Sequence, residues 1–258
     1  MMINLFNKFF IQNGLVIAFF MTAMIMLLSK GLSENLTKKK IPASAIAIFI
    51  GLLLAFLGGW IEKGKKGIAD IPEFSGFGIL GGAMFRDFAV VSTAMNANLK
   101  EIKKAGLAGL ISLLVGVLVP FILGSLLAVF WGYTDPISIT TIGAGACTFI
   151  VGPITGGALG ADSAVIALSI AAGLVKAILV TITTAPLAKS MGLDNPQTAM
   201  VYGGLMGTTS GVVAGLAATD QKLVPYGAMT ATFYSGLGCL LCPSLLYFTV
   251  RYFCALYF

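Results

Sequence analysis

Long apolar stretches alternate with short polar ones along most of this chain. A helix needs about 20 apolar residues to cross the hydrocarbon core of a bilayer. The stretches are continuous, whereas the strands of a membrane barrel alternate apolar and polar residues. The pattern therefore predicts an all-α, polytopic transmembrane protein, with residues 1–258 forming a single membrane domain. The eight predicted hydrophobic segments lie at 13–31, 41–61, 74–97, 104–131, 137–160, 161–188, 198–218 and 224–250.

Composition supports this fold class and narrows the function. Hydrophobic residues make up 58% of the chain and charged residues 10%, and the mean hydropathy is +0.98. Soluble domains carry about 25% charged residues, so a soluble enzyme and a nucleic-acid-binding domain are both excluded. The formal charge of +6 fits the Lys- and Arg-rich loops of a membrane protein. We expect a protein in a lipid bilayer that binds no nucleic acid.

Metal and acid–base chemistry have little support in the sequence. The chain has no His, which removes the usual general base and transition-metal ligand. Cys239 and Cys242 form a CxxC pair, but the pair lies inside an apolar stretch and no second pair of metal ligands exists. We interpret these cysteines as small packing residues. The chain is therefore predicted to be no enzyme and to hold no cofactor and no transition metal.

Three of the apolar stretches are interrupted near their middle. Gly, Pro, Ser, Thr or a charged pair interrupts residues 74–97, 137–160 and 198–218. A helix broken inside a membrane leaves backbone groups unpaired, which is tolerated only where the break is buried in protein or lines a polar cavity. Interrupted segments at corresponding places in two halves of a chain point to the binding site of a transporter. We expect these segments to be broken or re-entrant.

A weak internal repeat accompanies the interruptions. The string SAIAI at 44–48 resembles SAVIA at 163–167, about 120 residues later, and other short pairs share a similar offset. This suggests two halves, 13–131 and 137–250. The alternative is chance, because strings of small apolar residues resemble one another easily.

Three charged residues fall near the middle of apolar stretches, where insertion of a charge costs about 2.5–3.5 kcal/mol. Arg86 and Asp87 lie in the middle of 74–97, and Lys176 lies in the centre of 161–188. We expect Arg86 and Lys176 to face an anion, with Asp87 as a partner or a cation ligand. Alternatively, Arg86 and Asp87 lie at the membrane surface, and Lys176 lies near an interface.

Small polar residues surround the predicted breaks. The runs VGPITGG at 151–157 and GTTSG at 207–211 fit the N-termini of half-helices, which direct N–H groups and a positive dipole end at anions. Hydroxyl and amide oxygens suit hard cations. The alternative is that these residues mediate close helix packing. The candidate substrate-binding residues are Arg86, Gly152, Thr155, Gly156, Lys176, Thr208, Thr209 and Ser210, and the candidate cation-binding residues are Asp87, Thr93, Asn96, Asn98, Thr141 and Thr148.

Paired broken helices favour a carrier over other membrane proteins. A channel would be expected to show a repeated filter or a ring of charges. A membrane-embedded hydrolase has no recognisable pattern here. A non-transporting scaffold or assembly subunit of a carrier complex stays open as the alternative.

Several motifs together resemble one transporter family. They are NGLV at 13–16, SAIAI at 44–48, TIGAGA at 141–146 followed by VGPITG at 151–156, and DSAVIALSI at 162–170. With these motifs in this order, essentially the whole chain resembles MadM, the larger subunit of the bacterial malonate:sodium symporter.

The resemblance implies sodium-coupled uptake of malonate, with sodium as the coupling ion. It also implies a small membrane partner subunit of the MadL type and a location in the bacterial inner membrane. A carrier of this kind would work by alternating access across the broken helices. A carrier for another small carboxylate is the alternative.

Overall fold

The computed structural model describes residues 9–36, 43–62, 67–80 and 99–257. Every element in these residues is helical, which confirms the predicted all-α class. The chain divides into two compact units, Met1–Ala89 and Val90–Phe258. Each unit is described by itself.

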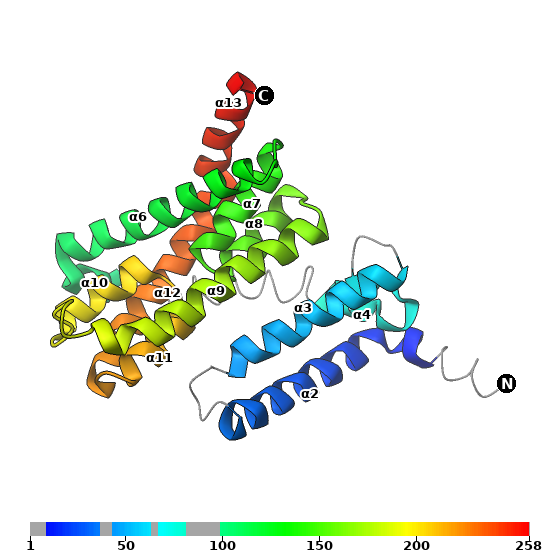
Figure 1. Ribbon diagram of the computed structural model, residues 1–258, viewed down its shortest axis with the longest axis horizontal. Helices are drawn as coiled ribbons and strands as arrows, with labels where there is room; N and C mark the ends of the chain where they lie inside the picture. Colours follow the sequence, from blue (N-terminus) through cyan, green and yellow to red (C-terminus); the bar gives the residue numbers. More distant parts are fainter. Residues whose placement is uncertain (1–8, 37–42, 63–66, 81–98, 258) are drawn as a thin grey trace. The chain divides into compact units, whose positions relative to one another are not determined.

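The first unit is built on two long helices that pack against each other (Figure 1). Close contacts at glycines join them to the short elements that follow, since a Cβ atom on Gly76 would overlap the backbone of Gly14. The predicted stretch at 74–97 is described only as far as Leu80, so its expected break lies outside the described residues. The elements are α2 (Gly14–Asn35), α3 (Ala43–Glu62), η1 (Gly67–Asp70), η2 (Pro72–Phe74) and α4 (Gly76–Ile79).

Three long helices extend through the second unit: α6 (Leu99–Phe130), α9 (Ser163–Leu187) and α12 (Val224–Leu241) (Figure 1). The backbone of α6 departs from helical angles at Gly106 (φ 65°, ψ −166°) and continues as a helix through Pro120. One pair of short helices lies between α6 and α9, and a second pair lies between α9 and α12.

The chain after α12 contains a distortion at Pro243. Cys242–Leu246, labelled η5, is a π-helical turn that leads into α13 (Tyr247–Tyr257). Proline has no backbone N–H, so it removes a hydrogen bond from the helix, and single π turns occur inside α-helices. The π-helical turn and the missing hydrogen bond thus fall at the same place in the chain.

The predicted stretch at 137–160 is divided into α7 (Pro136–Cys147) and α8 (Val151–Leu159). A Cβ atom on Gly156 would meet the methyl group of Thr141. In one continuous helix these residues would lie about 22 Å apart, at 1.5 Å per residue. The two short helices therefore fold back on each other, and we call α7 and α8 the first hairpin.

The last of the three predicted broken stretches is divided into α10 (Pro196–Met206) and α11 (Thr209–Ala217). Gly227 of α12 lies against Ala199, near the start of α10, and also against Leu216, near the end of α11. Both ends of this segment therefore reach the same level of α12. We call α10 and α11 the second hairpin.

The two hairpins enter the second unit from opposite ends, and their tips meet beside the middle of α9 (Figure 1). The tip of the first hairpin touches α9 at Gly173, where an added Cβ atom would overlap the backbone of Phe149. The first turn of the second hairpin's α11 touches α9 at Ala177, whose carbonyl oxygen lies against Gly211. The two contacts are only one helical turn apart on α9.

The two hairpins begin in a similar way. In each, an N-cap residue is followed by a proline at the first helical position. Asp135 Oδ1 accepts a hydrogen bond from Ser138 N at 2.8 Å, and Asn195 Oδ1 accepts one from Thr198 N at 3.0 Å. The two caps lie about 60 residues apart, and the helices that follow have similar lengths. The second unit thus contains an inverted pair of hairpins. The longer repeat of halves 13–131 and 137–250 stays a prediction.

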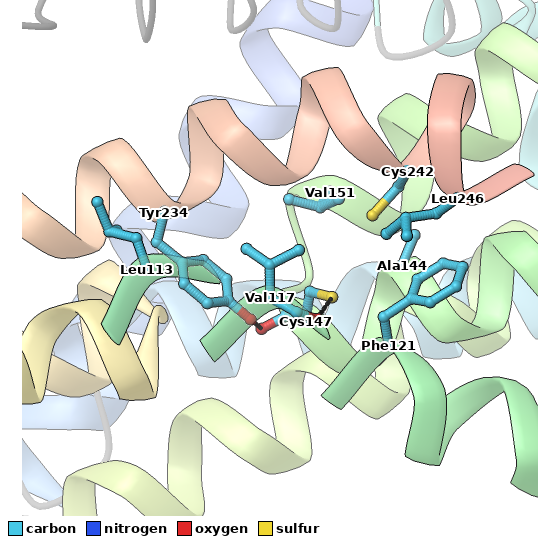
Figure 2. Packing of buried hydrophobic residues seen from close by; sticks show 9 residues of the cluster. All are labelled: Leu113, Val117, Phe121, Ala144, Cys147, Val151, Tyr234, Cys242 and Leu246. Atoms are coloured by element: carbon cyan, nitrogen blue, oxygen red, sulfur yellow. Dashed lines mark hydrogen bonds between the residues drawn. The ribbon is translucent and has the colours of Figure 1, made fainter. Parts of the chain in front are cut away.

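One buried hydrophobic cluster lies between α6, the first hairpin and α12 (Figure 2). Cys147 and Cys242 belong to it and Cys239 packs against it, in agreement with their interpretation as packing residues. All four cysteines are free thiols. The buried members are Leu113, Val117, Phe121, Ala144, Cys147, Val151, Tyr234, Cys242 and Leu246.

Four helical segments of the described chain are long and apolar enough to cross a membrane. Residues 49–61 and α7 are shorter apolar helices. These segments support a multi-pass membrane protein, while the count of eight stays a prediction. The four candidate spans are Gly14–Asn35, Gly106–Phe130, Ser163–Leu187 and Gln221–Tyr257.

Candidate functional site

A lysine lies where the two hairpin tips meet. Lys176 Nζ donates to the carbonyl oxygen of Cys147 at 2.7 Å and to the hydroxyl of Tyr234 at 3.3 Å. The same ammonium lies 5.1 Å from the centre of the Tyr234 ring. Cys147 is the last residue of α7, so its carbonyl belongs to the negative end of a half-helix. The site therefore already holds one positive charge.

Tyr234 connects this lysine to three other segments. Its hydroxyl donates to the carbonyl oxygen of Gly116 in α6 at 2.7 Å and lies 3.4 Å from the carbonyl of Cys147 (Figure 2). Its ring lies against Gly207 at the tip of the second hairpin, where an added Cβ atom would overlap it. The side chain is fully buried. Tyr234 thus fixes α12, α6 and both tips relative to Lys176.

Acidic side chains in this unit lie at the ends of helices. Asp135 and Asp162 precede α7 and α9, Asp220 precedes the 3₁₀ turn η4 (Gln221–Leu223), and Asp194 lies in the loop before α10. The oxygens around Lys176 are those of a backbone carbonyl and a tyrosine hydroxyl. These oxygens are neutral and do not balance the charge of the ammonium. A bound anion would balance it. This makes the meeting point of the tips suitable for an anionic ligand.

The first turn of α11 reaches α9 at the residue after Lys176, because Gly211 lies against the carbonyl oxygen of Ala177. Thr208 is the N-cap residue, and its backbone is extended (φ −88°, ψ 104°). Its hydroxyl is fully buried and has no hydrogen-bond partner among the described residues. The first N–H groups of a helix are unpaired within the helix, so those of Thr209 and Ser210 are available to a ligand. The run at 207–211 therefore places a buried, unpaired hydroxyl at the N-terminus of a helix, and anion binding by this run stays a prediction.

The N-terminus of α8 differs, because its first N–H groups already donate to Thr148. The carbonyl oxygen of Thr148 accepts hydrogen bonds from Val151 N at 3.0 Å and Gly152 N at 3.3 Å, and its hydroxyl accepts one from Ile150 N at 3.3 Å. Gly152 packs against Ser169 of α9. These contacts match the alternative reading, in which the small residues of this run serve close packing.

Gly156 and Thr155 lie further along α8. Gly156 packs against Thr141 and Ile166, one turn or more from the tip. Thr155 is fully buried, and its hydroxyl has no hydrogen-bond partner in the described part of the chain. Thr155 therefore has an unused polar atom inside the first hairpin, whereas Gly156 has a steric role.

The predicted cation ligands of the first hairpin are both buried. Thr141 Oγ1 donates to the carbonyl of Ile137 at 2.7 Å. Thr148 lies at the tip, next to the Cys147 carbonyl that receives the Lys176 hydrogen bond. A hydroxyl oxygen that donates its proton keeps lone pairs for a cation. The other predicted residues, Arg86, Asp87, Thr93, Asn96 and Asn98, lie outside the described residues.

A cavity of about 670 Å³ lies between the start of α6 and α10. It follows α10 from Gln197 near its first turn to Met206 at the tip of the second hairpin. Thr198 supplies a hydroxyl to its lining. The cavity therefore extends from one end of the unit toward the site at the hairpin tips.

Four of the candidate substrate-binding residues, Lys176, Thr208, Thr209 and Ser210, lie in the middle of α9 or at the tip of the second hairpin, and their role in binding stays a prediction. Sequence reasoning did not single out every residue at this point. It missed Tyr234, which in the sequence is one aromatic residue among many in an apolar stretch. It also missed the carbonyl oxygens of Cys147 and Gly116, because backbone groups carry no residue-specific signal.

Comparison with known proteins gives one match. Residues 6–254 match the family described as the malonate/sodium symporter MadM subunit. Searches of curated proteins and of solved structures found no match. The match covers nearly the whole chain and confirms the resemblance drawn from the motifs. The chain therefore belongs to the MadM family and is a multi-pass membrane subunit of a sodium-coupled malonate symporter.

Proposed function

We propose that the unit Val90–Phe258 binds malonate where the hairpin tips meet. One carboxylate accepts hydrogen bonds from the Thr208 hydroxyl and from the first N–H groups of α11. The other carboxylate faces Lys176. The observation that carries this proposal is the Thr208 hydroxyl, which is fully buried at a helix N-terminus and unpaired among the described residues.

The position of α11 on α9 supports placing both carboxylates in one site. Gly211, in the first turn of α11, lies against the carbonyl of Ala177, which follows Lys176 directly in the chain. Malonate has two carboxylates joined through one carbon atom. A helix N-terminus and an ammonium at the same level of α9 can therefore bind both ends of this small dianion.

Sodium would bind beside malonate, on oxygens of the first hairpin. The hydroxyls of Thr141 and Thr148 and the carbonyl end of α7 are hard oxygen ligands. A role for Thr155 in this hairpin belongs to the same proposal. Arg86, Asp87, Thr93, Asn96 and Asn98 stay candidates from the sequence.

Transport by alternating access fits the arrangement of the hairpins. They enter from opposite ends and meet beside α9, so movement of either tip would open the site toward one side only. The cavity along α10 would be the route to the site from one end. We place the symporter in the bacterial inner membrane, with a small membrane partner subunit of the MadL type.

The proposed malonate site can be tested in proteoliposomes that contain the full chain, with and without a co-expressed partner subunit. Thr208→Val preserves the shape of the side chain and removes its hydroxyl. We expect the half-saturating malonate concentration for sodium-driven uptake to rise at least tenfold. Thr183→Val is the matched control, because Thr183 is exposed on α9 and bonds only within its own helix. Wild-type uptake by the Thr208→Val variant would rule out this site.

A further inference from the structure

We propose that Lys176 is the switch that couples sodium binding to malonate binding. In the substrate-free protein its ammonium occupies the oxygen position that sodium takes once malonate is bound. This inference rests on the proposed malonate site at the N-terminus of α11. It assigns to Lys176 a second role, as an internal competitor of the coupling ion.

The oxygens around the ammonium are of the kind that bind sodium. Lys176 Nζ lies 2.7 Å from the carbonyl of Cys147 and 3.3 Å from the hydroxyl of Tyr234. Hard monovalent and divalent cations select carbonyl and hydroxyl oxygens. The Cys147 carbonyl also ends a helix, where the dipole favours any positive charge. An ammonium and a sodium ion would therefore compete for this position.

The hydroxyl of Thr148 enlarges the same group of oxygens. Thr148 follows Cys147 directly, is almost fully buried, and begins the break between α7 and α8. Release of the ammonium from Cys147 would make this carbonyl oxygen, and the remaining lone pairs of the neighbouring hydroxyl oxygens, accessible to a cation at the hairpin tip. A sodium ion would then bind these oxygens in place of the Lys176 ammonium.

The second position of the ammonium lies within reach of the same side chain. The carbonyl of Ala177 lies against Gly211 in the first turn of α11. Consecutive Cα atoms are about 3.8 Å apart, so this turn lies at the level of Lys176. A lysine side chain has four flexible carbons. It can therefore turn from the carbonyl end of α7 to a carboxylate bound at α11 by rotation of its own bonds.

The exchange makes the two ligands cooperative. Malonate draws the ammonium toward α11 and opens the oxygen position to sodium. By linkage, sodium then raises the affinity for malonate by the same factor. Without malonate, the Lys176 ammonium occupies the position that sodium would take. Sodium binding is then unfavourable, because the two positive charges repel each other. The empty carrier keeps its positive charge at the tip and does not carry sodium by itself.

Binding of radioactive sodium to the purified full chain, with its co-expressed partner subunit, tests the switch directly. In the wild type we expect malonate to raise sodium affinity by about tenfold or more, within the usual range of such coupling. In Lys176→Met and Lys176→Gln, sodium should bind without malonate as tightly as it binds to the wild type with malonate. Malonate should then change sodium affinity less than twofold.

Two further variants isolate the role of the charge. Lys176→Arg keeps a cation on the chain and should keep weak sodium binding in the absence of malonate. Lys189→Met removes an exposed lysine that follows α9 and should behave as the wild type. Size-exclusion chromatography of each variant verifies folding, and Lys176→Gln replaces Lys176→Met if the methionine variant aggregates.

The switch is overturned if both neutral variants bind sodium as weakly as the substrate-free wild type, or if malonate still strengthens their sodium binding tenfold. It is also overturned if malonate has no effect on sodium binding by the wild type. Failure of the malonate site gives a different result, since Thr208→Val would then bind malonate normally. The two proposals can therefore fail separately.

Discussion

Lys176 Nζ lies 2.7 Å from the carbonyl oxygen of Cys147, although the two residues are 29 positions apart in the sequence. This hydrogen bond joins the middle of α9 to the tip of a hairpin that enters beside it. The contact depends on the space left by Gly173, which lets the tip approach α9 closely. The predictions below test the lysine's surroundings and the hairpin geometry that creates them.

The close approach of the first hairpin to α9 predicts that Gly173→Ala impairs transport. The added methyl group would overlap the backbone of Phe149, which cannot move as easily as a side chain. Overpacking of this kind costs about 1–3 kcal/mol. We expect a lower thermal unfolding temperature and at least a fivefold loss of malonate uptake. Gly31→Ala is the matched control, because among the described residues no atom outside the adjoining turns of its own helix lies within 4 Å of its added Cβ. Equal behaviour of the two variants would show that the tip does not pack here.

The hydroxyl of Tyr234 is expected to matter more than its ring. Tyr234→Phe keeps the buried ring but leaves the carbonyl of Gly116 without its donor and Lys176 without one acceptor. An unpaired buried polar group costs about 1–3 kcal/mol. Uptake assays should show a loss of at least tenfold, with the chain still inserted. Tyr252→Phe, on the exposed surface of α13, should leave uptake unchanged. Full uptake by Tyr234→Phe would remove this hydroxyl from the site.

The fold-back of α7 and α8 predicts a specific disulfide. In a chain whose native cysteines are replaced by serine, Thr141→Cys combined with Gly156→Cys should form an intramolecular bond upon mild oxidation. Thr141 and Gly156 are in contact across the hairpin, whereas a straight helix would separate them by about 22 Å. Mass spectrometry of proteolytic peptides measures the linkage. Thr183→Cys with Gly156→Cys is the unlinked control, and equal yields from both pairs would contradict the hairpin.

Asp135 and Asn195, the N-cap residues of α7 and α10, should contribute similarly to stability. Asp135→Ala and Asn195→Ala each remove the side-chain acceptor for a backbone N–H. Loss of an N-cap typically costs about 1 kcal/mol of stability. The thermal unfolding temperature in detergent should therefore fall in both variants, and by a similar number of degrees in each. Asp135→Asn keeps an acceptor and should retain most of the stability. A shift in only one of the alanine variants would argue against equivalent hairpins.

The sequence predicted the positions of two breaks because the residues at those positions are informative. Gly207, Thr208 and Thr148 interrupt otherwise apolar stretches, and they lie between the half-helices in the structure. The sequence could not show whether each broken segment crosses or turns back, because both arrangements need the same residues at the break. Only contacts between distant residues, such as Thr141 with Gly156, distinguish them.

The candidate site was predicted in part for a similar reason. A lysine in an apolar stretch is conspicuous, so Lys176 could be singled out. The glycines of the run at 151–157 have the same composition as those of an anion site, yet Gly152 N bonds to Thr148 and its Cα faces Ser169. Whether a glycine serves a ligand or a neighbouring helix depends on tertiary packing, which a local pattern does not contain.

The glycine contacts along α9 have a mechanical consequence. Gly145 and Gly152 of the first hairpin, and Gly211 and Gly215 of the second, rest directly on this helix without side chains that interlock with it. Interlocking side chains resist sliding, whereas glycines add no side chain of their own to oppose the small shear movements by which packed helices shift. A shear movement of either hairpin along α9 would therefore meet little steric resistance at these four glycines.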